Sequence, residues 1–503
     1  MATQSLLPPP PPPPEFSAKA ILNLNRLLIT LLPNKILFLS FFILLPLTSI
    51  LTQSTRTPTI VLSLPTIHHV SLLALFLLLL LLLPIRYFKS SPSPVYILDF
   101  TCFKPPITCR VPHATFLEHS RLLVDENSVR FQMRILERSG IGEETGLPPP
   151  SLYLPPKASL EGSRAESEQV IFSCIDELLI TTSFDPKHID ILVLDSNNFS
   201  PTPSLTSMIV NKYKLNTNVL TFNLSGMGCS ASPISLGLAK DLLQVYPNSN
   251  ALVVSAQIIV SPNWYMGSER SMLIPNCLFR MGGAAILMTN RRSERRHAKY
   301  QLHHVVRTHT GTDDKAYRCV YQLEDSQGRQ GVSLEKDVMP ISAEALKINI
   351  SNLGPLVLPR SEQLHYIFSL LVHKIINPKR KIYVPDFKKA FDHFCVHAGG
   401  RAIIDEVEKN LKLTSEQVEA SRMTLYRFGN TSSCSIWYEL GYIEAKGKMK
   451  KGDRVWQLGL GSGFKCNSAV LECLNNISLP VKSGAWADCI DRFPVEIPKI
   501  IKF

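Results

Sequence analysis

The sequence predicts an α/β protein of two α/β halves, preceded by two membrane-spanning helices. Two features predict this architecture: two long charge-free apolar stretches near the N-terminus, and an alternation of short β-branched runs with longer amphipathic stretches from about Val95 onward. Of the 503 residues, 45% are hydrophobic and 19% are charged. That composition supplies a large core and excludes a disordered or fibrous chain.

Residues 1–94 are expected to form a disordered proline-rich tail and a two-helix transmembrane hairpin. The polyproline tract at 8–14 has neither the backbone donors of a helix nor the side chains of a core. The spans are expected at about 36–55 and 66–85. The first is free of charge for 20 residues, enough for a helix rising ~1.5 Å per residue to cross a hydrocarbon layer about 30 Å thick. The second contains seven consecutive leucines, Leu77–Leu83.

The charges around this hairpin predict its orientation. Three basic residues precede the first span and two follow the second, whereas only Arg56 lies between the spans. Positive-inside counting therefore places both ends in the cytosol. A secretory signal peptide is the alternative for the first stretch, but no small-residue cleavage pattern follows Leu51. Eleven cysteines without a CxxC pair also indicate a reducing compartment.

The first α/β half is expected over residues 95–300. Its strands are short apolar runs bounded by polar or glycine-containing turns, as expected for strands buried on both faces, and its helices are the amphipathic stretches between them. The expected strands are Asp190–Asp195, Ala251–Ser255 and Ala284–Thr289, and the expected helices are Glu168–Ile180 and Ser232–Val245.

A second α/β half is expected over residues 366–503, after a connecting segment at 301–365. The stretch Arg401–Leu411 has its apolar residues on one helical face, and Arg454–Leu460 has the character of a strand. The chain therefore repeats its strand and helix pattern in both halves.

Cys229 is the first candidate catalytic residue. It follows two closely spaced glycines, Gly226 and Gly228, and stands just before the expected helix at 232–245. The free N–H groups and positive dipole end of a helix N-terminus favour a thiolate, so the sequence predicts a lowered thiol pKa. The alternative is a buried structural cysteine, which the glycine-flanked turn argues against.

Two histidines in His393–His397 form the second candidate. On an extended segment His393, Cys395 and His397 share one face. A metal site is not expected, because only Cys395 stands at a zinc-like spacing. Core histidines and a general base or oxyanion donor remain open from the residues alone.

Two turns complete the set of candidates. The turn Phe428–Ser433 carries Asn430 among small hydrogen-bonding residues. The stretch Gly459–Gly463 is expected to be a glycine-rich loop at the end of a strand, where the backbone of Gly461 and Gly463 can come close to a ligand. It lacks the helix context and the lysine of nucleotide-binding loops, so a nucleotide cofactor is not expected.

The net charge of +12 favours anionic partners. A solvated face is one explanation of the basic clusters, and the anionic membrane surface or coenzyme A phosphates are the others. Nucleic acid is not expected, because no recognition motif accompanies the charge. The clusters are Arg291 to Lys299, Lys379 to Lys381, and Lys446 to Lys451.

A series of motifs over about 400 residues resembles the plant 3-ketoacyl-CoA synthases, the condensing enzymes of very-long-chain fatty acid elongation. They are Tyr96–Pro106, Glu137–Thr145, Pro201–Leu205, Asn276–Ala285, Arg307–Thr310, His393–Arg401, Arg427–Ser433, Trp437–Leu440 and Gly461–Ala469. The resemblance implies a thiolase-like fold of two related α/β halves, and a Cys-His-Asn triad at Cys229, His397 and Asn430.

In that chemistry the cysteine is acylated by an acyl-CoA, and malonyl-CoA then decarboxylates to an enolate that attacks the acyl group. His397 and Asn430 are expected to stabilise the enolate oxygen, and the backbone N–H of Cys229, with one from the Gly459 to Gly463 loop, is expected to stabilise the tetrahedral intermediate. His309 and His393 are expected to support the active site.

The resemblance also implies partners and a location. The substrates are acyl-CoA and malonyl-CoA, with neither a cofactor nor a metal. The expected partners are a second copy of the chain and the ketoacyl reductase, hydroxyacyl dehydratase and enoyl reductase of the elongase. The expected location is the endoplasmic reticulum membrane, as a multi-pass protein with a cytosolic catalytic domain. The alternatives are a catalytically weak scaffold subunit and a polyketide-type condensing enzyme. The intact triad argues against the first and the apolar spans against the second.

Overall fold

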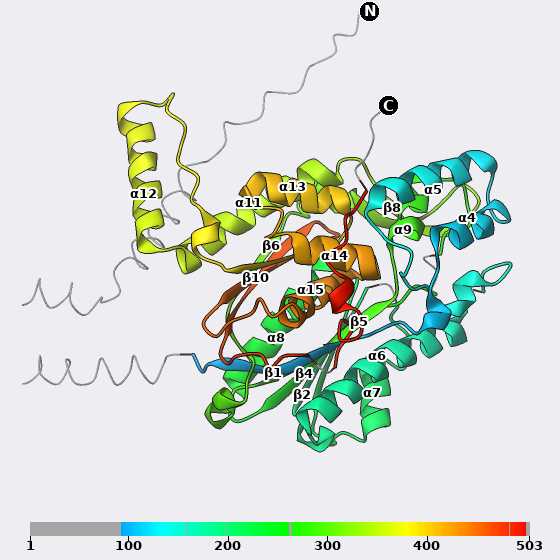
Figure 1. Ribbon diagram of the computed structural model, residues 1–503, viewed down its shortest axis with the longest axis horizontal. Coiled ribbons are helices and arrows are strands. Elements are labelled where there is room, and N and C mark those ends of the chain that lie inside the picture. The colour runs from blue at the N-terminus through cyan, green and yellow to red at the C-terminus, as the bar shows by residue number, and fades with distance from the viewer. Residues whose placement is uncertain (1–91, 158, 198, 261–263, 482, 499–503) are drawn as a thin grey trace, which may run out of the picture. The chain divides into compact units, whose positions relative to one another are not determined.

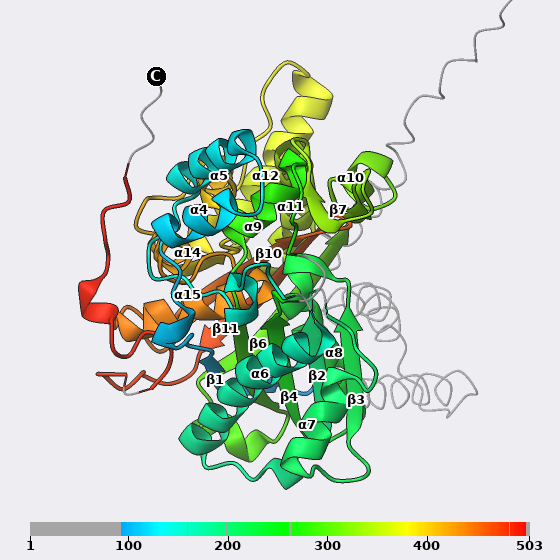
Figure 2. The same ribbon diagram turned by 90° about the vertical axis from the view of Figure 1, so that its right-hand side faces the viewer.

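A nine-stranded mixed sheet runs through the described part of the chain, with strand order β3-β2-β4-β5-β1-β6-β11-β10-β9 (Figures 1 and 2). The computed structural model describes residues 92–157, 159–197, 199–260, 264–481 and 483–498. The predicted tail and both predicted transmembrane spans lie outside these residues. No helix that the structure describes is long and apolar enough to cross a bilayer.

The strands are β1 (Val95–Cys102), β2 (Ile191–Ser196), β3 (Leu220–Ser225), β4 (Asn250–Gln257), β5 (Gly282–Thr289), β6 (Tyr300–His309), β7 (Val320–Glu324), β8 (Gln330–Leu334), β9 (His393–Val396), β10 (Arg454–Gly461) and β11 (Lys465–Cys473). The α-helices are α4 (His113–Arg121), α5 (Glu126–Ser139), α6 (Leu160–Thr182), α7 (Leu205–Tyr213), α8 (Ala231–Val245), α9 (Arg270–Leu278), α10 (Asp314–Arg318), α11 (Val338–Val357), α12 (Arg360–Leu371), α13 (Arg401–Leu411), α14 (Glu419–Phe428) and α15 (Ser435–Ala445). Two short helices, η4 (Gly228–Ser230) and η8 (Ser432–Cys434), lie next to α8 and α15.

The helices form layers on and between the two parts of the sheet. Helices α6 and α7 cover β1 to β5 on one outer side, and α11 covers β6 and β11 on the other. Helix α8 lies between the two parts: it contacts β2 and β4 as well as β6, β10 and β11. Helix α15 contacts β1, β9 and β10 in the same middle layer. Two α/β halves are thus joined through one central pair of helices.

The predicted strands and helices of both halves are confirmed. Strands β2, β4 and β5 are buried along their whole length, which explains why their sequences are continuous apolar runs. Helix α13 has the predicted bounds, with Ile404 and Val407 buried. The segment 301–365 was predicted to connect the two halves. It contributes most of β6 and all of α11 to the layers.

The glycine-rich loop is shorter than predicted. Gly459 and Gly461 lie within β10 and pair with β11, so the loop is only the turn at 462–464. The backbone of these glycines is extended because β11 pairs with it in the antiparallel direction, whereas the parallel pairing of β9 with β10 ends at Leu458.

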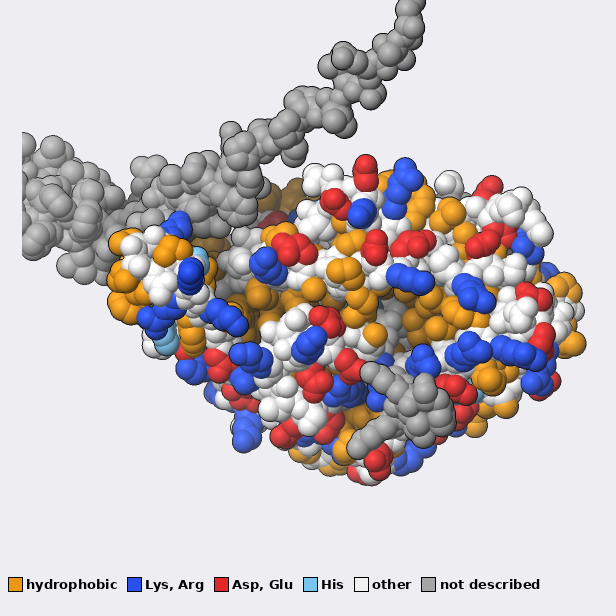
Figure 3. Space-filling model, turned by 90° about the horizontal axis from the view of Figure 1, so that it is seen from above, with side chains coloured by type: hydrophobic (Ala, Val, Ile, Leu, Met, Phe, Trp, Pro, Cys, Tyr) orange, Lys and Arg blue, Asp and Glu red, His pale blue; other side chains and the backbone are white. Residues whose placement is uncertain are grey.

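A lobe formed by residues 360–386 stands out from the layers, seen in yellow at the left of Figure 1 and at the left edge of the space-filling view in Figure 3. It consists of α12, one π-helical turn at Val372–Ile376 and the irregular segment that returns to Asp386. We call it the α12 lobe.

Candidate active site

Cys229 lies in η4, between the end of β3 and the start of α8. The preceding Gly228 has a φ of +67°, and a Cβ on it would lie 2.6 Å from the backbone nitrogen of Ser462. Only glycine fits this position, because a side chain would suffer both backbone strain and the close approach of the β10–β11 turn. The predicted placement of Cys229 just before a helix N-terminus is confirmed.

The three predicted triad residues come from separate elements and meet around Ser432. The Ser432 side chain lies beside the thiol of Cys229, and the Ser432 backbone lies beside the imidazole of His397. The Ser432 N–H donates to Asn430 Oδ1 over 2.9 Å. The structure therefore brings Cys229, His397 and Asn430 to one place, where η4 contacts η8.

His397 directly follows β9 and is buried. Its Nδ1 lies 2.9 Å from the Ser435 hydroxyl, which leaves Nε2 for the site. Burial lowers the pKa of His397 to about 4, so the imidazole is neutral at pH 7. Asn430 is tied to the same segment, because its Nδ2 donates to the Gly399 carbonyl over 3.0 Å.

The predicted lowering of the Cys229 thiol pKa is wrong in direction. Burial raises the pKa of this thiol, and the nearby Ser432 side chain offsets the rise only in part. The loss of water around the sulfur outweighs the hydrogen bonds that favour the thiolate, and the neutral His397 supplies no positive charge to oppose it. Among the eleven cysteines, all within the described residues, Cys229 is the one that is not fully buried, and none forms a disulfide.

Gly461 and Gly463 line the site from the β10–β11 side. A Cβ on Gly461 would lie 2.7 Å from the Cys229 backbone nitrogen, so the strand backbone packs directly on η4. His309 ends β6 opposite Lys465, and its Nδ1 accepts from Gly311 N over 3.0 Å. Burial lowers the pKa of His309, and the Lys465 charge adds to the shift. His309 thus lies next to the turn that contains Gly463.

His393 is not brought to this place. It begins β9, four residues before His397, and its Nε2 lies 2.8 Å from Asp453 Oδ2. At a rise of about 3.3 Å per residue, the strand separates it from His397 by roughly 13 Å. The segment is extended, as the shared face of these residues requires. His393, however, lies at the far end of the strand from His397, where it pairs with Asp453.

Sequence reasoning missed the residues that support the triad. Beyond Ser432 and Ser435, a buried carboxylate at the end of β2, Asp195, accepts hydrogen bonds from three hydroxyls. The donors are Ser235 of α8 at 2.8 Å, Ser255 of β4 at 2.6 Å and Ser433 of η8 at 2.7 Å. Asp195 thereby links the helix that follows Cys229 to the turn that carries Asn430. In the sequence, the one indication that Asp195 belongs to the site is its place at the carboxyl end of a predicted strand.

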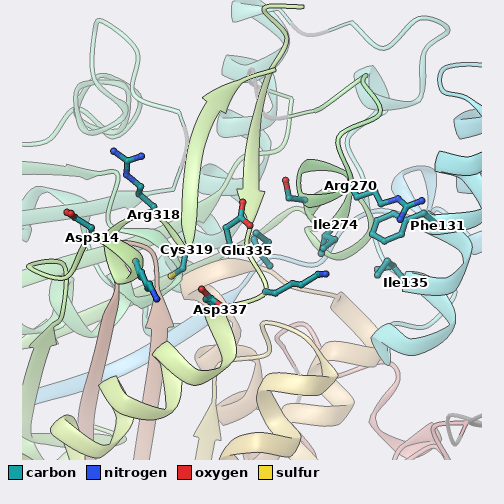
Figure 4. Close-up of a pocket in the computed structure, with 13 residues that line it drawn as sticks. Phe131, Ile135, Arg270, Ile274, Asp314, Arg318, Cys319, Glu335 and Asp337 are labelled. Carbon is teal, nitrogen blue, oxygen red and sulfur yellow. The ribbon is translucent and has the colours of Figure 1, made fainter. Parts of the chain in front are cut away.

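A separate hollow of about 970 Å³ lies between α5, α9, α10 and β8 (Figure 4). Phe131, Ile135 and Ile274 form an apolar wall, with the Arg270 guanidinium 5.6 Å from the Phe131 ring centroid. Arg318 lies on the opposite side. Within the described residues, no group of three or more His, Cys, Asp or Glu side chains is placed to hold a metal ion.

Comparisons with known proteins show the family of this chain. A family model described as "FAE1/Type III polyketide synthase-like protein" matches residues 87–375, and one for the C-terminal part of 3-oxoacyl-[acyl-carrier-protein] synthase III matches residues 388–473. Two relatives in Arabidopsis thaliana, 3-ketoacyl-CoA synthases 6 and 5, are each 61% identical over 83% of this chain; the matches cover 84% and 85% of their lengths. The chain belongs to the 3-ketoacyl-CoA synthase family.

Solved structures support the fold of this family member. A fungal type III polyketide synthase named ORAS matches with a TM-score of 0.60 at 18% identity, over 75% of this chain and 99% of the other. The I375F mutant of CsyB matches with a TM-score of 0.60 at 17% identity, over 76% of this chain and 100% of the other. At these identities the likeness concerns the fold alone, and it supports the predicted thiolase-like arrangement of the described residues.

Proposed function

We propose that this 3-ketoacyl-CoA synthase condenses malonyl-CoA with a long-chain acyl-CoA to give a 3-ketoacyl-CoA, through an acyl group held on Cys229. The observation that supports this most directly is the meeting of Cys229, His397 and Asn430 around Ser432. Of two alternatives, a scaffold subunit does not require these side chains to converge, and a polyketide-type enzyme has less support from the 61% identical relatives.

In the first half-reaction, Cys229 attacks the thioester carbonyl of the acyl-CoA. His397 Nε2 takes the thiol proton, the new carbon–sulfur bond forms, and the bond to coenzyme A breaks. Coenzyme A leaves as a thiolate, which takes a proton from water, and His397 keeps the thiol proton on Nε2. A neutral His397 suits this role because it has a free lone pair to accept the proton at pH 7.

In the second half-reaction, the bond between the carboxylate and the methylene carbon of malonyl-CoA breaks and carbon dioxide leaves. The electron pair forms an enolate, whose oxygen accepts hydrogen bonds from His397 Nε2 and the Asn430 amide. The enolate carbon then attacks the acyl carbonyl on Cys229, and the sulfur leaves as a thiolate and regains the proton held on His397 Nε2. The product is two carbons longer than the acyl-CoA.

The hollow of Figure 4 is the proposed approach for coenzyme A. Arg270, Lys315 and Arg318 offer cations for phosphates beside an apolar wall that suits a pantetheine arm. Helix α10, which supplies Lys315 and Arg318, begins five residues after His309 in the chain.

We further propose that the chain resides in the endoplasmic reticulum membrane, with the described unit in the cytosol, and that it works beside the reductases and dehydratase of an elongase, as a homodimer. The two apolar stretches at 36–55 and 66–85 support the membrane assignment. No cofactor is assigned to the reaction, because both half-reactions use only the triad and the two thioesters.

The test is a condensation assay on microsomes from a host that lacks this activity, given labelled malonyl-CoA and acyl-CoAs of graded length. We expect labelled 3-ketoacyl products with the intact chain and none with Cys229→Ala. Products from Cys229→Ala at the same level would refute the role of Cys229, and absence of products from both chains would refute the activity.

A further inference from the structure

The α12 lobe has an inverted arrangement of polar and apolar side chains. Its inward face carries Glu362 and Ser369, which are buried, whereas Leu364, Phe368 and Ile375 follow at helical spacing on the outward face. Phe368 is 64% exposed and Ile375 is 76% exposed. A helix in contact with water normally has the opposite arrangement.

Hydrogen bonds hold the inward face in place. Tyr383 on the returning segment donates from its hydroxyl to Glu362 over 2.7 Å and from its N–H to Ser369 over 2.7 Å. Lys389 pairs with Glu362 at 2.5 Å. The lobe is therefore fixed with its apolar face outward. The large apolar side chains exposed on it are Leu364, Phe368, Leu371, Ile375, Ile376, Ile382 and Val384.

The exposed charged side chains of the lobe are basic. Lys374, Lys379, Arg380 and Lys381 are exposed, and none forms an ion pair with a residue that the structure describes. Both acidic side chains of the lobe are engaged: Glu362 accepts from the Asp386 N–H, and Asp386 accepts from the N–H of Lys388 just beyond the lobe. Figure 3 shows blue and orange side chains next to one another at this edge.

We propose that the α12 lobe is a membrane-contact element that inserts its apolar side chains into the surface of an anionic bilayer. A lipid surface accommodates both features: apolar side chains enter the boundary between headgroups and acyl chains, about 5–10 Å deep, and lysines and arginine meet the phosphates. A symmetric contact with a second copy would bring the same four cations together, with no exposed carboxylate on the lobe to compensate.

This contact is distinct from the predicted N-terminal spans and from the proposed reaction. It would give the catalytic unit a fixed orientation on the membrane, with the lobe as a second point of attachment about 270 residues after the spans. Failure of the condensation assay would leave this proposal unaffected, because none of the lobe residues takes part in the chemistry.

The test is fluorescence quenching by lipids with brominated acyl chains, on the full chain in phosphatidylcholine nanodiscs with or without phosphatidylserine. Ile375→Trp places the probe on the lobe. Ile180→Trp is the matched control, because Ile180 is 77% exposed at the end of α6, outside the lobe. We expect Ile375→Trp to lose a larger share of its fluorescence than Ile180→Trp, and more so with phosphatidylserine.

A charge-reversal arm tests the basic residues. In the Ile375→Trp chain, Lys379→Glu with Lys381→Glu should reduce the quenching, and added salt should do the same to the unreversed chain. The control reversal is Arg292→Glu with Arg295→Glu, in another basic cluster outside the lobe. Thermal melting of every variant checks its folding.

Equal quenching of the two tryptophan probes would overturn the proposal. An emission shift of Ile375→Trp that depends on the number of chains per nanodisc, and not on the brominated lipid, would also overturn it. That result would mean that a second copy of the chain covers this face. Quenching unchanged by charge reversal and by salt would overturn the anionic part of the proposal.

Discussion

Cys229 and His397 form an uncharged pair in the free enzyme. Burial raises the pKa of the thiol above its ordinary value of 9.0 and lowers that of the imidazole to about 4, so at pH 7 the proton stays on sulfur. In the proposed reaction, the thiolate would therefore form only when substrate binds and His397 takes the proton. This differs from cysteine enzymes that keep a preformed thiolate beside a charged imidazole.

The pH dependence of alkylation checks this pairing. We expect iodoacetamide to modify Cys229 before the ten buried cysteines, at a rate that keeps rising as the pH passes 9, because the reactive thiolate is the minor form below its raised pKa. Peptide mass spectrometry measures the rate for each cysteine. A rate that is already constant near pH 7 would show a thiolate and contradict the assignment.

Asn430→Ala separates the two half-reactions. The amide has no titratable group, so acylation of Cys229 should remain, while malonyl-CoA decarboxylation should fall by roughly 10²–10³ through loss of one donor to the enolate oxygen. Single-turnover assays measure acyl label on the protein and then carbon dioxide release. Loss of acylation with decarboxylation intact would mean that Asn430 has a structural role in placing Ser432.

Among the elements, the contact between β10 and η4 controls the position of the nucleophile. Gly461→Ala should sharply reduce condensation, because its Cβ would lie 2.5 Å from Ser230 N and 2.7 Å from Cys229 N and would push η4 away. Gly452→Ala is the control, since no atom lies within 4 Å of a Cβ there, although its φ of +91° adds some backbone strain. The measurements are activity and thermal melting. Equal activity of both variants would contradict the close approach.

The attachment of α12 depends on Glu362, whose pKa is lowered to about 2 chiefly by its bond with Lys389 and then by that with Tyr383. A lowered carboxyl pKa contributes stability above its ordinary value of 4.5 that is lost as the pH falls toward 2. Glu362→Gln should speed amide hydrogen exchange over 360–386 at pH 7 and leave 401–411 unchanged. The difference from the parent should shrink below pH 4.5.

At the scale of the whole molecule, we expect membrane contacts in two regions, the predicted spans and the α12 lobe. A chain that begins at Val95 should lose resistance to carbonate extraction, because it lacks both apolar stretches but keeps all except two residues of the compact unit at 93–503. Fractionation of microsomes with and without carbonate measures this. A shortened chain that resists carbonate as the full chain does would show that the predicted spans are not the only integral anchor.

By itself, the sequence indicated the triad of Cys229, His397 and Asn430 only through the family resemblance, and that assignment remains a prediction. It determined several strands and helices and the position of Cys229 before a helix. These depend on local patterns: apolar periodicity, glycine at a tight turn, and motifs of residues close in the chain. The membrane spans belong to the same class of inference and remain a prediction.

Only the tertiary structure decided the protonation of the site and its supporting contacts. The pKa of Cys229 depends on how completely α8, β10 and η8 exclude water around it, and no short stretch of sequence carries that information. The same holds for His393, which the strand directs to Asp453, and for Asp195, whose partners lie 40, 60 and 238 residues away. Burial and long-range hydrogen bonds come from packing, and packing appears only when the two halves close around α8 and α15.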